Sequence, residues 1–436
     1  MSESWLASGL SPMATELRGS SILVIAAQVR AMVAAGRDIC NLTIGDFKPA
    51  EYPIPARLRE ACVAAVNDGY TNYPPPNGIT ELREAVVELY RQRMGITVDP
   101  AVVTIASGAR PLLYACYRAL IAPGDTVVYA VPSWNNDHYS KMLGARAVEV
   151  EVGPEDHFFP RPDQIRPHLG KARLVALNSP LNPSGTCIRR EKLTEICQDI
   201  VAENERRKAT GDKPLFLLYD QIYWMLTLGD FGHADPISCV PEMADYAICV
   251  DGISKAFAAT GMRVGWGIAP APISQAMNRI LGHVGAWAPH PNQRATVELL
   301  RDAAAVDGYL SWIRSEARDR LALLHSRLSA MGELLPIRAL APEGAIYLSV
   351  EFGLRGWSWR GRVMNTADDV RTFLLESSGM AVVPFDAFGA SHAIDWYRLS
   401  VGAVSRQELS AVMDRLEAGL AELQAPHAAA ASAPLA

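Results

Sequence analysis

The chain lacks several features that mark specialised classes of protein. Its apolar runs, such as residues 22–27 and 215–219, fall far short of the roughly 18–20 residues that a membrane-spanning helix needs. Lys and Arg number 41 against 47 Asp and Glu, and the net charge of −6 argues against a nucleic-acid-binding protein, which usually carries a basic excess. Residues 1–20 have no basic stretch followed by an apolar one, so we expect no signal peptide and a cytoplasmic location.

Paired cysteines and metal-binding spacings are also missing. The seven cysteines are scattered and odd in number, and none forms a C-x-x-C pair. This pattern argues against a disulfide framework and fits a reducing compartment. The nine histidines show no H-E-x-x-H or similar spacing, so we expect no metal site. Most of these side chains are expected to fill the core or lie on the surface, with room for an exception such as His283.

What the chain has is the composition of a globular enzyme, with 49% hydrophobic and 20% charged residues. One hydrophobic core rarely serves more than roughly 250–300 residues, so the 436 residues here predict two domains. Apolar strands separated by amphipathic helical stretches, such as 111–121 and 191–207, predict an α/β fold with a mostly parallel, seven-stranded sheet. The predicted strands are 102–106, 126–131, 147–152, 174–177, 215–219, 247–250 and 264–268.

The remaining pattern predicts a second, smaller α+β domain. Helical stretches at 309–331, 367–377 and 406–423 alternate there with strand-like segments at 345–350, 380–383 and 396–400. We place an N-terminal arm at 1–20, the first part of the small domain at 21–55, the large domain at 56–325, the rest of the small domain at 326–424 and a disordered Ala/Pro/Ser tail at 425–436.

The strongest chemical signal is Lys255, which follows an apolar strand in Asp251-Gly-Ile-Ser-Lys255. An ammonium group there is costly unless its pKa falls or it reacts, and a desolvated amine suits Schiff-base chemistry. Ser254 and Arg263 would add a hydroxyl donor and a planar cation suited to phosphate. A lysine in a surface loop explains this segment equally well when it is taken alone. The match of residues 252–256 to the G-x-S-x-G nucleophile motif is a weak rival, because the last Gly is absent.

Three other segments place functional side chains at strand ends. Asn182, Asp220 and Tyr223 follow apolar strands, at the edge where open α/β sheets bind ligands. An Asp there could pair with a cationic ring nitrogen and a Tyr could donate to a phenolate oxygen, although capping and packing are common roles. The small residues of 106–111 would let backbone amides at a helix N-terminus approach an anion. Trp134 could supply an aromatic face.

These signals together describe one ligand. It has a carbonyl for the lysine, a phosphate for the small-residue turn and the cation, a basic ring nitrogen for Asp220 and a ring oxygen for Asn182 and Tyr223. Pyridoxal 5′-phosphate meets every requirement.

Short motifs that agree with this ligand occur in order along the chain. They are Leu42-Thr-Ile-Gly45-Asp-Phe, Asn72-Tyr73-Pro-Pro-Pro-Asn-Gly78-Ile-Thr-Glu-Leu-Arg83, Ser107-Gly-Ala-Arg110, Pro123-Gly-Asp125, Asn178-Ser-Pro-Leu-Asn182-Pro-Ser-Gly185, Tyr219-Asp220-Gln-Ile-Tyr223, Ser254-Lys255-Ala-Phe, Gly261-Met-Arg263-Val-Gly265 and Arg398-Leu-Ser. Most are individually modest, but their order and spacing are highly specific. From about residue 20 to 423, the chain resembles a fold-type I, class I/II aminotransferase of the aspartate aminotransferase family.

This resemblance implies a set of roles around the cofactor. Lys255 would bind pyridoxal 5′-phosphate as a Schiff base and carry the substrate's Cα proton. Asp220 would keep the pyridine nitrogen protonated, and Tyr223 and Asn182 would hydrogen-bond the ring oxygen. The implied catalytic residues are Lys255, Asp220 and Tyr223, and the further cofactor contacts are Trp134 on the ring, Gly108, Ala109, Ser254 and Arg263 on the phosphate, and Tyr73 on the phosphate of the neighbouring subunit.

The resemblance also implies substrate contacts and a partner. Arg398 would bind the substrate α-carboxylate with its forked guanidinium, helped by Asn182, Trp134 and the Gly45 backbone. A surface ion pair is the alternative role for Arg398. The reach of Tyr73 into a neighbouring site implies an obligate homodimer with shared active sites. The ligands would be an amino acid and a 2-oxo acid, with neither nucleic acid nor membrane as a partner.

Some positions limit what the resemblance carries over. Arg110 stands where some relatives have a lysine that binds the substrate's distal carboxylate, so it would either bind an acidic substrate or form an inter-helix ion pair. His283, Trp287 and His290 lie in a loosely matching inter-subunit loop and are candidates for substrate specificity. In the segment 134–139, the spacing between Trp134 and the tyrosine that follows it differs from the usual spacing in the family. The resemblance therefore does not predict which side chains form that wall of the pocket.

The predicted function is a ping-pong aminotransferase acting on an L-amino acid, acidic or aromatic, and a 2-oxo acid. A lyase of the same fold, such as a C–S β-lyase or a β-decarboxylase, would share Lys255, Asp220 and Arg398 and stays an alternative. A ligand-sensing regulator would need an added DNA-binding domain, and residues 1–20 are too short to contain one.

Overall fold

The computed structural model describes residues 6–17, 19, 21–230, 232–391 and 395–426. Its main sheet has seven strands in the order β2-β8-β7-β6-β5-β3-β4. The strands run parallel except β8, which is antiparallel to β2 and β7. The predicted mostly parallel, seven-stranded α/β sheet is confirmed. Its strands are β2 (Val103–Ala106), β3 (Thr126–Val131), β4 (Arg146–Glu151), β5 (Ala172–Asn178), β6 (Phe216–Asp220), β7 (Ala247–Gly252) and β8 (Gly265–Ile268).

Helices cover both faces of this sheet, which explains why its central strands are apolar throughout. In β6, Leu217 belongs to the same apolar cluster as Ile196 of α9, whereas its neighbour Leu218 clusters with Leu113 of α6 on the other face. Alternate side chains of a strand point to opposite faces, so a central strand covered on both faces needs apolar residues at most positions. The first face carries α8 (Pro162–Leu169), α9 (Arg190–Thr210) and α10 (Pro236–Cys239), and the second carries α6 (Ala109–Leu120), α7 (Asn136–Leu143) and α12 (Ala271–Val284).

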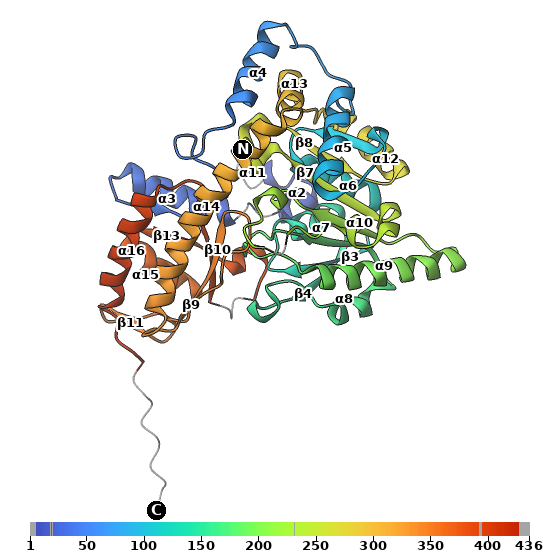
Figure 1. Ribbon diagram of the computed structural model, residues 1–436. Helices are drawn as coiled ribbons and strands as arrows, with labels where there is room; N and C mark the ends of the chain where they lie inside the picture. Colours follow the sequence, from blue (N-terminus) through green and yellow to red (C-terminus); the bar gives the residue numbers. More distant parts are fainter. Residues whose placement is uncertain (1–5, 18, 20, 231, 392–394, 427–436) are drawn as a thin grey trace, which may run out of the picture.

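A second sheet, in the order β14-β15-β10-β9, forms the smaller unit at the left of Figure 1. The long helix α14 leads into it, beginning at Ala303 rather than at Tyr309. The N-terminal segment contacts this unit, because β1 pairs in parallel with β13 and Val29 of α3 packs against Leu375 of α15. The elements are α3 (Ser21–Ala34), β1 (Cys40–Asn41), α14 (Ala303–Met331), β9 (Ile337–Ala339), β10 (Tyr347–Phe352), α15 (Ala367–Ser378), β13 (Met380–Ala381), β14 (Val383–Pro384), β15 (Trp396–Ser400) and α16 (Arg406–Leu420).

Some predicted elements differ in extent from the observed ones. The single strand expected at 380–383 divides into β13 and β14, because these pair with different partners, β1 and β15. Within the arm predicted at 1–20, α2 (Pro12–Glu16) is a short exposed helix capped by Ser11. Most of the tail predicted at 425–436 lies outside the described residues, and the exact domain limits stay predictions. The other described α-helices and strands are α4 (Ala56–Asn67), α5 (Thr80–Met94), α11 (Ile253–Ala256), α13 (His290–Leu300), β11 (Ser358–Trp359) and β12 (Arg362–Val363).

None of the helices described here combines the length and the apolar character that crossing a membrane would require.

Candidate active site

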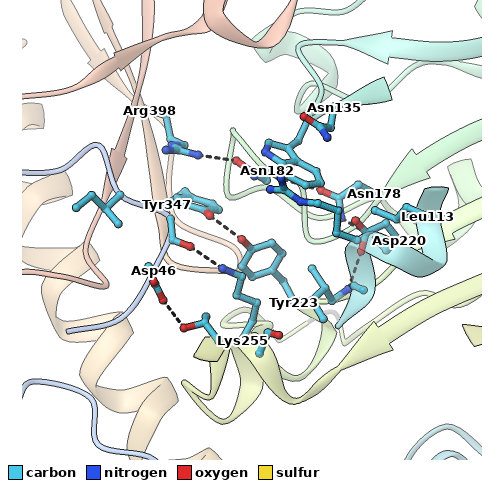
Figure 2. Close-up of a pocket in the computed structure, with 18 of the residues that line it drawn as sticks. Asp46, Leu113, Asn135, Asn178, Asn182, Asp220, Tyr223, Lys255, Tyr347 and Arg398 are labelled. Carbon is cyan, nitrogen blue, oxygen red and sulfur yellow. Dashed lines mark hydrogen bonds between the residues drawn. The ribbon is translucent and has the colours of Figure 1, made fainter. Parts of the chain in front are cut away.

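A cavity of about 660 Å³ lies where the two sheets meet, at the carboxyl ends of the parallel strands. Asn178 and Asp220 end β5 and β6 and line the cavity from the large sheet. Tyr347 of β10 and Arg398 of β15 line it from the second sheet. This volume is in the range of small-molecule sites, and the strand ends are where α/β sheets bind ligands. Figure 2 shows these four side chains around one space.

Lys255 enters the cavity from α11, the short helix that follows β7. Its Nζ donates a hydrogen bond to the backbone carbonyl of Gly45, at 2.5 Å. Burial lowers the pKa of the lysine to about 8, although the nearby carboxylate of Asp46 favours the charged form. Lys255 forms no ion pair with a carboxylate among the described residues. A larger fraction of this amine is therefore neutral and nucleophilic near neutral pH than for an ordinary lysine.

Asp220 presents its carboxylate on the same side of the sheet. Its Oδ1 accepts a hydrogen bond from the amide of Ile222, at 3.1 Å, and its backbone carbonyl accepts one from the side chain of Asn178, at 2.7 Å. Burial raises the pKa of Asp220 to about 6, and the charge of Lys255 opposes this shift. A cation placed beside this carboxylate would favour its ionised form and be held by it.

The N-terminus of α6 forms a cradle suited to an anion. Gly108 has φ of 91° and lies so close to Arg263 that a Cβ atom would come within 2.4 Å of the guanidinium Nη2. Arg263 is fixed by donating to the backbone carbonyls of Thr260 and Ser107, each at 2.8 Å. Ser254 also lines the cavity. The helix N-terminus, a held guanidinium and a hydroxyl together suit a phosphate group.

Arg398 is buried without an acidic partner among the described residues. Its guanidinium donates to Oδ1 of Asn182 at 2.9 Å and to the carbonyl of Thr43 at 2.5 Å, and it lies between the rings of Tyr347 and Phe388. Its Nε is buried without a hydrogen-bond partner in the described part of the chain. Burial lowers the pKa of Arg398. A buried cation with a free donor is costly unless an anion binds it, so the alternative role in a surface ion pair is not supported.

Trp134 and Arg110 form another wall of the cavity. The guanidinium carbon of Arg110 lies 4.6 Å from the centre of the Trp134 ring. Arg110 makes no ion pair with any described carboxylate, so the inter-helix pair considered for it is not found. The residue after Trp134 in this wall, Asn135, has φ of 67° and is labelled in Figure 2.

The four residues expected at a subunit interface, Tyr73, His283, Trp287 and His290, lie outside this cavity. Tyr73 is 81% exposed and meets Trp287 edge to face, with ring centres 5.1 Å apart. His283 and Trp287 line a separate surface depression, and His290 packs against Tyr70. Tyr73 and His283 are exposed and Trp287 and His290 are half-buried, and the roles of all four at a subunit interface stay predictions.

Tyr347, Asp46 and Arg30 line the cavity but were not singled out from the sequence. The hydroxyl of Tyr347 is 2.6 Å from that of Tyr223, and Asp46 accepts a hydrogen bond from Thr260 at 2.6 Å. Tyr347 lies on the same face of its sheet as Arg398, because Ser349, two residues further along β10, pairs with Arg398. An alternating strand pattern places Tyr347 on one face or the other, but only the register shows that it faces the arginine.

Comparisons with known proteins agree with this geometry. The family model of aminotransferase class I and II matches residues 37–416. The chain is 30% identical to an aspartate/prephenate aminotransferase of Thermus thermophilus, over 93% of this chain and 97% of that protein. It is 31% identical to an aspartate aminotransferase of Pinus pinaster, over 97% of this chain and 83% of the other. Among solved structures, the aspartate aminotransferase from Thermus thermophilus with maleate superposes with a TM-score of 0.83 at 28% identity, covering 94% of this chain and 99% of that one.

Proposed function

The chain belongs to the class I and II aminotransferase family, and from this premise we propose that its cavity binds pyridoxal 5′-phosphate together with an amino acid or a 2-oxo acid. The enzyme is an aminotransferase, and no observation favours the lyase of the same fold. The bound cofactor supplies a carbonyl that condenses with amines and a ring that accepts the electrons released at the substrate Cα.

The described residues fit that cofactor. The cradle formed by Gly108, Ala109, Ser254 and Arg263 suits its phosphate, because side chains there are small or are donors. Asp220, whose pKa is raised by burial, lacks only the cation that a protonated ring nitrogen would provide. The observation that carries the proposal is Lys255, an amine with its pKa lowered to about 8, directed into this same space.

Three other side chains that line the cavity are proposed to contact the cofactor ring. Tyr223 and Asn182 would donate to the ring oxygen, and Trp134 would offer a flat face to the ring. Tyr73 is proposed to reach the phosphate in the partner subunit of a homodimer. The exposure of its side chain on this chain supports this role. We also infer a cytoplasmic location, since all seven cysteines are free thiols, as a reducing compartment would keep them.

Substrate binding is proposed to use two arginines. Arg398 would pair with the α-carboxylate through its forked guanidinium, next to Asn182 and the backbone of Gly45. Arg110, held over Trp134 and without a described carboxylate partner, would bind a second carboxylate on the substrate side chain. The names of the relatives, which include aspartate and prephenate, and the maleate complex of one of them support an acidic substrate.

In the reaction, Lys255 moves the proton that transamination requires. Its Nζ would accept the proton from the substrate Cα and deliver it to the cofactor carbon that received the amino group. Arg398 and Arg110 would hold the substrate at both ends while this transfer takes place. The first half of the cycle would remove the amino group from an amino acid, and the second half would give it to a 2-oxo acid.

An absorbance spectrum of the purified enzyme tests this proposal. We expect a visible cofactor band that disappears when aspartate or glutamate is added and returns with a 2-oxo acid. A band that persists while pyruvate or ammonia accumulates would instead indicate the lyase. No band after reconstitution with pyridoxal 5′-phosphate would overturn the assignment of the cavity.

A further inference from the structure

Tyr347 connects two parts of the cavity that the proposed function uses separately. Its hydroxyl oxygen is 2.6 Å from the hydroxyl oxygen of Tyr223, with which it shares a hydrogen bond. The guanidinium carbon of Arg398 lies 4.7 Å from the centre of the Tyr347 ring. Figure 2 shows Tyr347 between Arg398 on one side and Tyr223 and Lys255 on the other.

The position of Tyr347 is closely constrained by its surroundings. A Cβ atom on Gly45 would lie 2.6 Å from the Tyr347 hydroxyl, so the backbone that accepts the Lys255 hydrogen bond runs against this side chain. The rings of Tyr347 and Tyr223 meet edge to face, with centres 5.5 Å apart. The side chain therefore has little room to turn its hydroxyl away from Tyr223.

We propose that Tyr347 is a positioning residue that orients the Tyr223 hydroxyl and couples it to the carboxylate-binding site at Arg398. This inference rests on the proposed function, in which Tyr223 donates to the cofactor ring oxygen. When Tyr223 donates its proton to that oxygen, Tyr347 must donate to Tyr223. Each of the two hydrogen bonds in such a chain is stronger than it would be without the other.

The charge of Arg398 adds to this effect. Burial raises the pKa of both phenols, and Arg398 opposes this rise in each of them. A substrate carboxylate that pairs with Arg398 removes much of that influence. Binding at the carboxylate site thus weakens the hydrogen bond that Tyr223 gives to the ring oxygen, partly by the direct effect of the charge and partly through the Tyr347 ring and hydroxyl.

The test is the substitution Tyr347→Phe, which keeps the ring under Arg398 and removes the hydroxyl. The quantity measured is the pH midpoint of the visible band of the holoenzyme, which reports the proton held at Lys255 Nζ. We expect the midpoint to rise by roughly half a unit to one unit, the size expected when a buried phenol loses one hydrogen bond. Succinate, a dicarboxylate that carries no amino group, should raise the midpoint of the wild-type enzyme by neutralising Arg398. The increment should be smaller in the variant, where only the direct effect of the Arg398 charge on Lys255 and Tyr223 remains.

Tyr397→Phe is the matched control. Tyr397 is also buried in the second sheet, and its hydroxyl donates to the carbonyl of Ala367 at 2.8 Å, but it does not line the cavity. It should lower the melting temperature of the protein without changing the pH midpoint or the response to succinate. If Tyr347→Phe behaves in the same way as Tyr397→Phe, Tyr347 is only a packing residue and the inference is wrong. Absence of the visible band in the wild-type enzyme would instead overturn the proposed function.

Discussion

Arg398 and Arg110 both line the cavity without a carboxylate partner among the described residues, yet their surroundings differ. Arg398 is buried and fixed by Asn182 and Thr43, so it can accept only a group that enters in one orientation. Arg110 rests on the face of Trp134, and among the described residues no side-chain hydrogen bond restricts it. The arrangement of Arg398 suits the α-carboxylate, which all amino-acid substrates carry. The arrangement of Arg110 suits a side-chain carboxylate, which only acidic substrates carry.

The substitution Arg110→Ala should therefore reduce kcat/KM for acidic amino acids by roughly 10–100-fold, as expected for one lost charge-assisted hydrogen bond, and have little effect on neutral ones. Arg398→Lys is the matched comparison, because an ammonium cannot reproduce the forked contact, and it should raise KM for both classes. Steady-state kinetics with aspartate and with a neutral amino acid distinguish the two effects. Equal losses for both classes in Arg110→Ala would assign Arg110 a structural role.

At the scale of elements, the site is assembled from the ends of strands and the beginning of a helix. Asp220 ends β6, Lys255 follows β7 and the N-terminus of α6 follows β2. Local sequence patterns report such junctions well, because an apolar strand followed by glycine and polar residues is visible without tertiary information. The close approach of Arg263 to Gly108 adds a requirement for glycine that a strand-to-helix turn alone does not impose.

Gly108→Ala should weaken cofactor binding because its Cβ would displace the Arg263 guanidinium. Gly124→Ala is a suitable control: Gly124 has φ of 88°, similar to the 91° of Gly108, but a Cβ there would meet no atom within 4 Å. Both variants should lose roughly 1–3 kcal/mol of stability, because a side chain is disfavoured at positive φ. Only Gly108→Ala should also raise the dissociation constant for pyridoxal 5′-phosphate, measured by titrating the apoenzyme. Equal cofactor affinity in the two variants would contradict this account of the cradle.

At the scale of the whole molecule, the core contains a carboxylate beneath the site. Asp251 is fully buried and accepts hydrogen bonds from the Gly252 amide, the Trp224 indole and the Tyr90 hydroxyl. Burial raises the pKa of Asp251 to about 7, against the effect of these hydrogen bonds. In the unfolded chain an Asp titrates near pH 4. Between about pH 4 and pH 7, the folded protein therefore holds a proton that the unfolded chain has released.

The sign of the resulting pH dependence follows directly. The contribution of Asp251 to stability is fully present below about pH 4 and declines as the pH rises towards 7, by at most about 1.4 kcal/mol per pH unit. Asp251→Asn should remove this decline, so its free energy of unfolding should depend less on pH in that interval. Denaturant unfolding at several pH values measures the difference, with Asp230→Asn as an exposed control. A pH dependence identical to that of the wild-type protein would show that Asp251 is ionised in the fold.

The proposed homodimer makes a prediction that involves two chains. Lys255→Ala and Tyr73→Ala should each be nearly inactive, for different reasons. If Tyr73 serves the partner's site, a mixed dimer has one site with both defects and one intact site. Random mixing should then recover about a quarter of the wild-type activity, because half of the dimers are mixed. Mixing Lys255→Ala with Asp220→Asn should recover no activity, since both residues belong to the site of the same chain. If neither mixture recovers activity although the subunits exchange, the shared site is excluded.

The amino-acid sequence by itself determined the class of fold, the seven strands of the main sheet and most of the residues that meet in the cavity. These features depend on short patterns, such as the apolar strands and the residues that follow them, which are local in the chain. Lys255, Asp220, Asn182 and Arg263 could be named because each stands at a predicted strand end or beside one.

Only the tertiary structure showed that Tyr347 of the second sheet enters the cavity beside Arg398. Tyr347 and Arg398 face the same space because of the register between β10 and β15, and a shift of one residue would turn Tyr347 to the opposite face. The lack of a described acidic partner for Arg398, the stacking of Arg110 on Trp134 and the exposure of Tyr73 likewise depend on contacts between segments far apart in the chain. Such contacts are set by packing of the whole molecule, which no local pattern records.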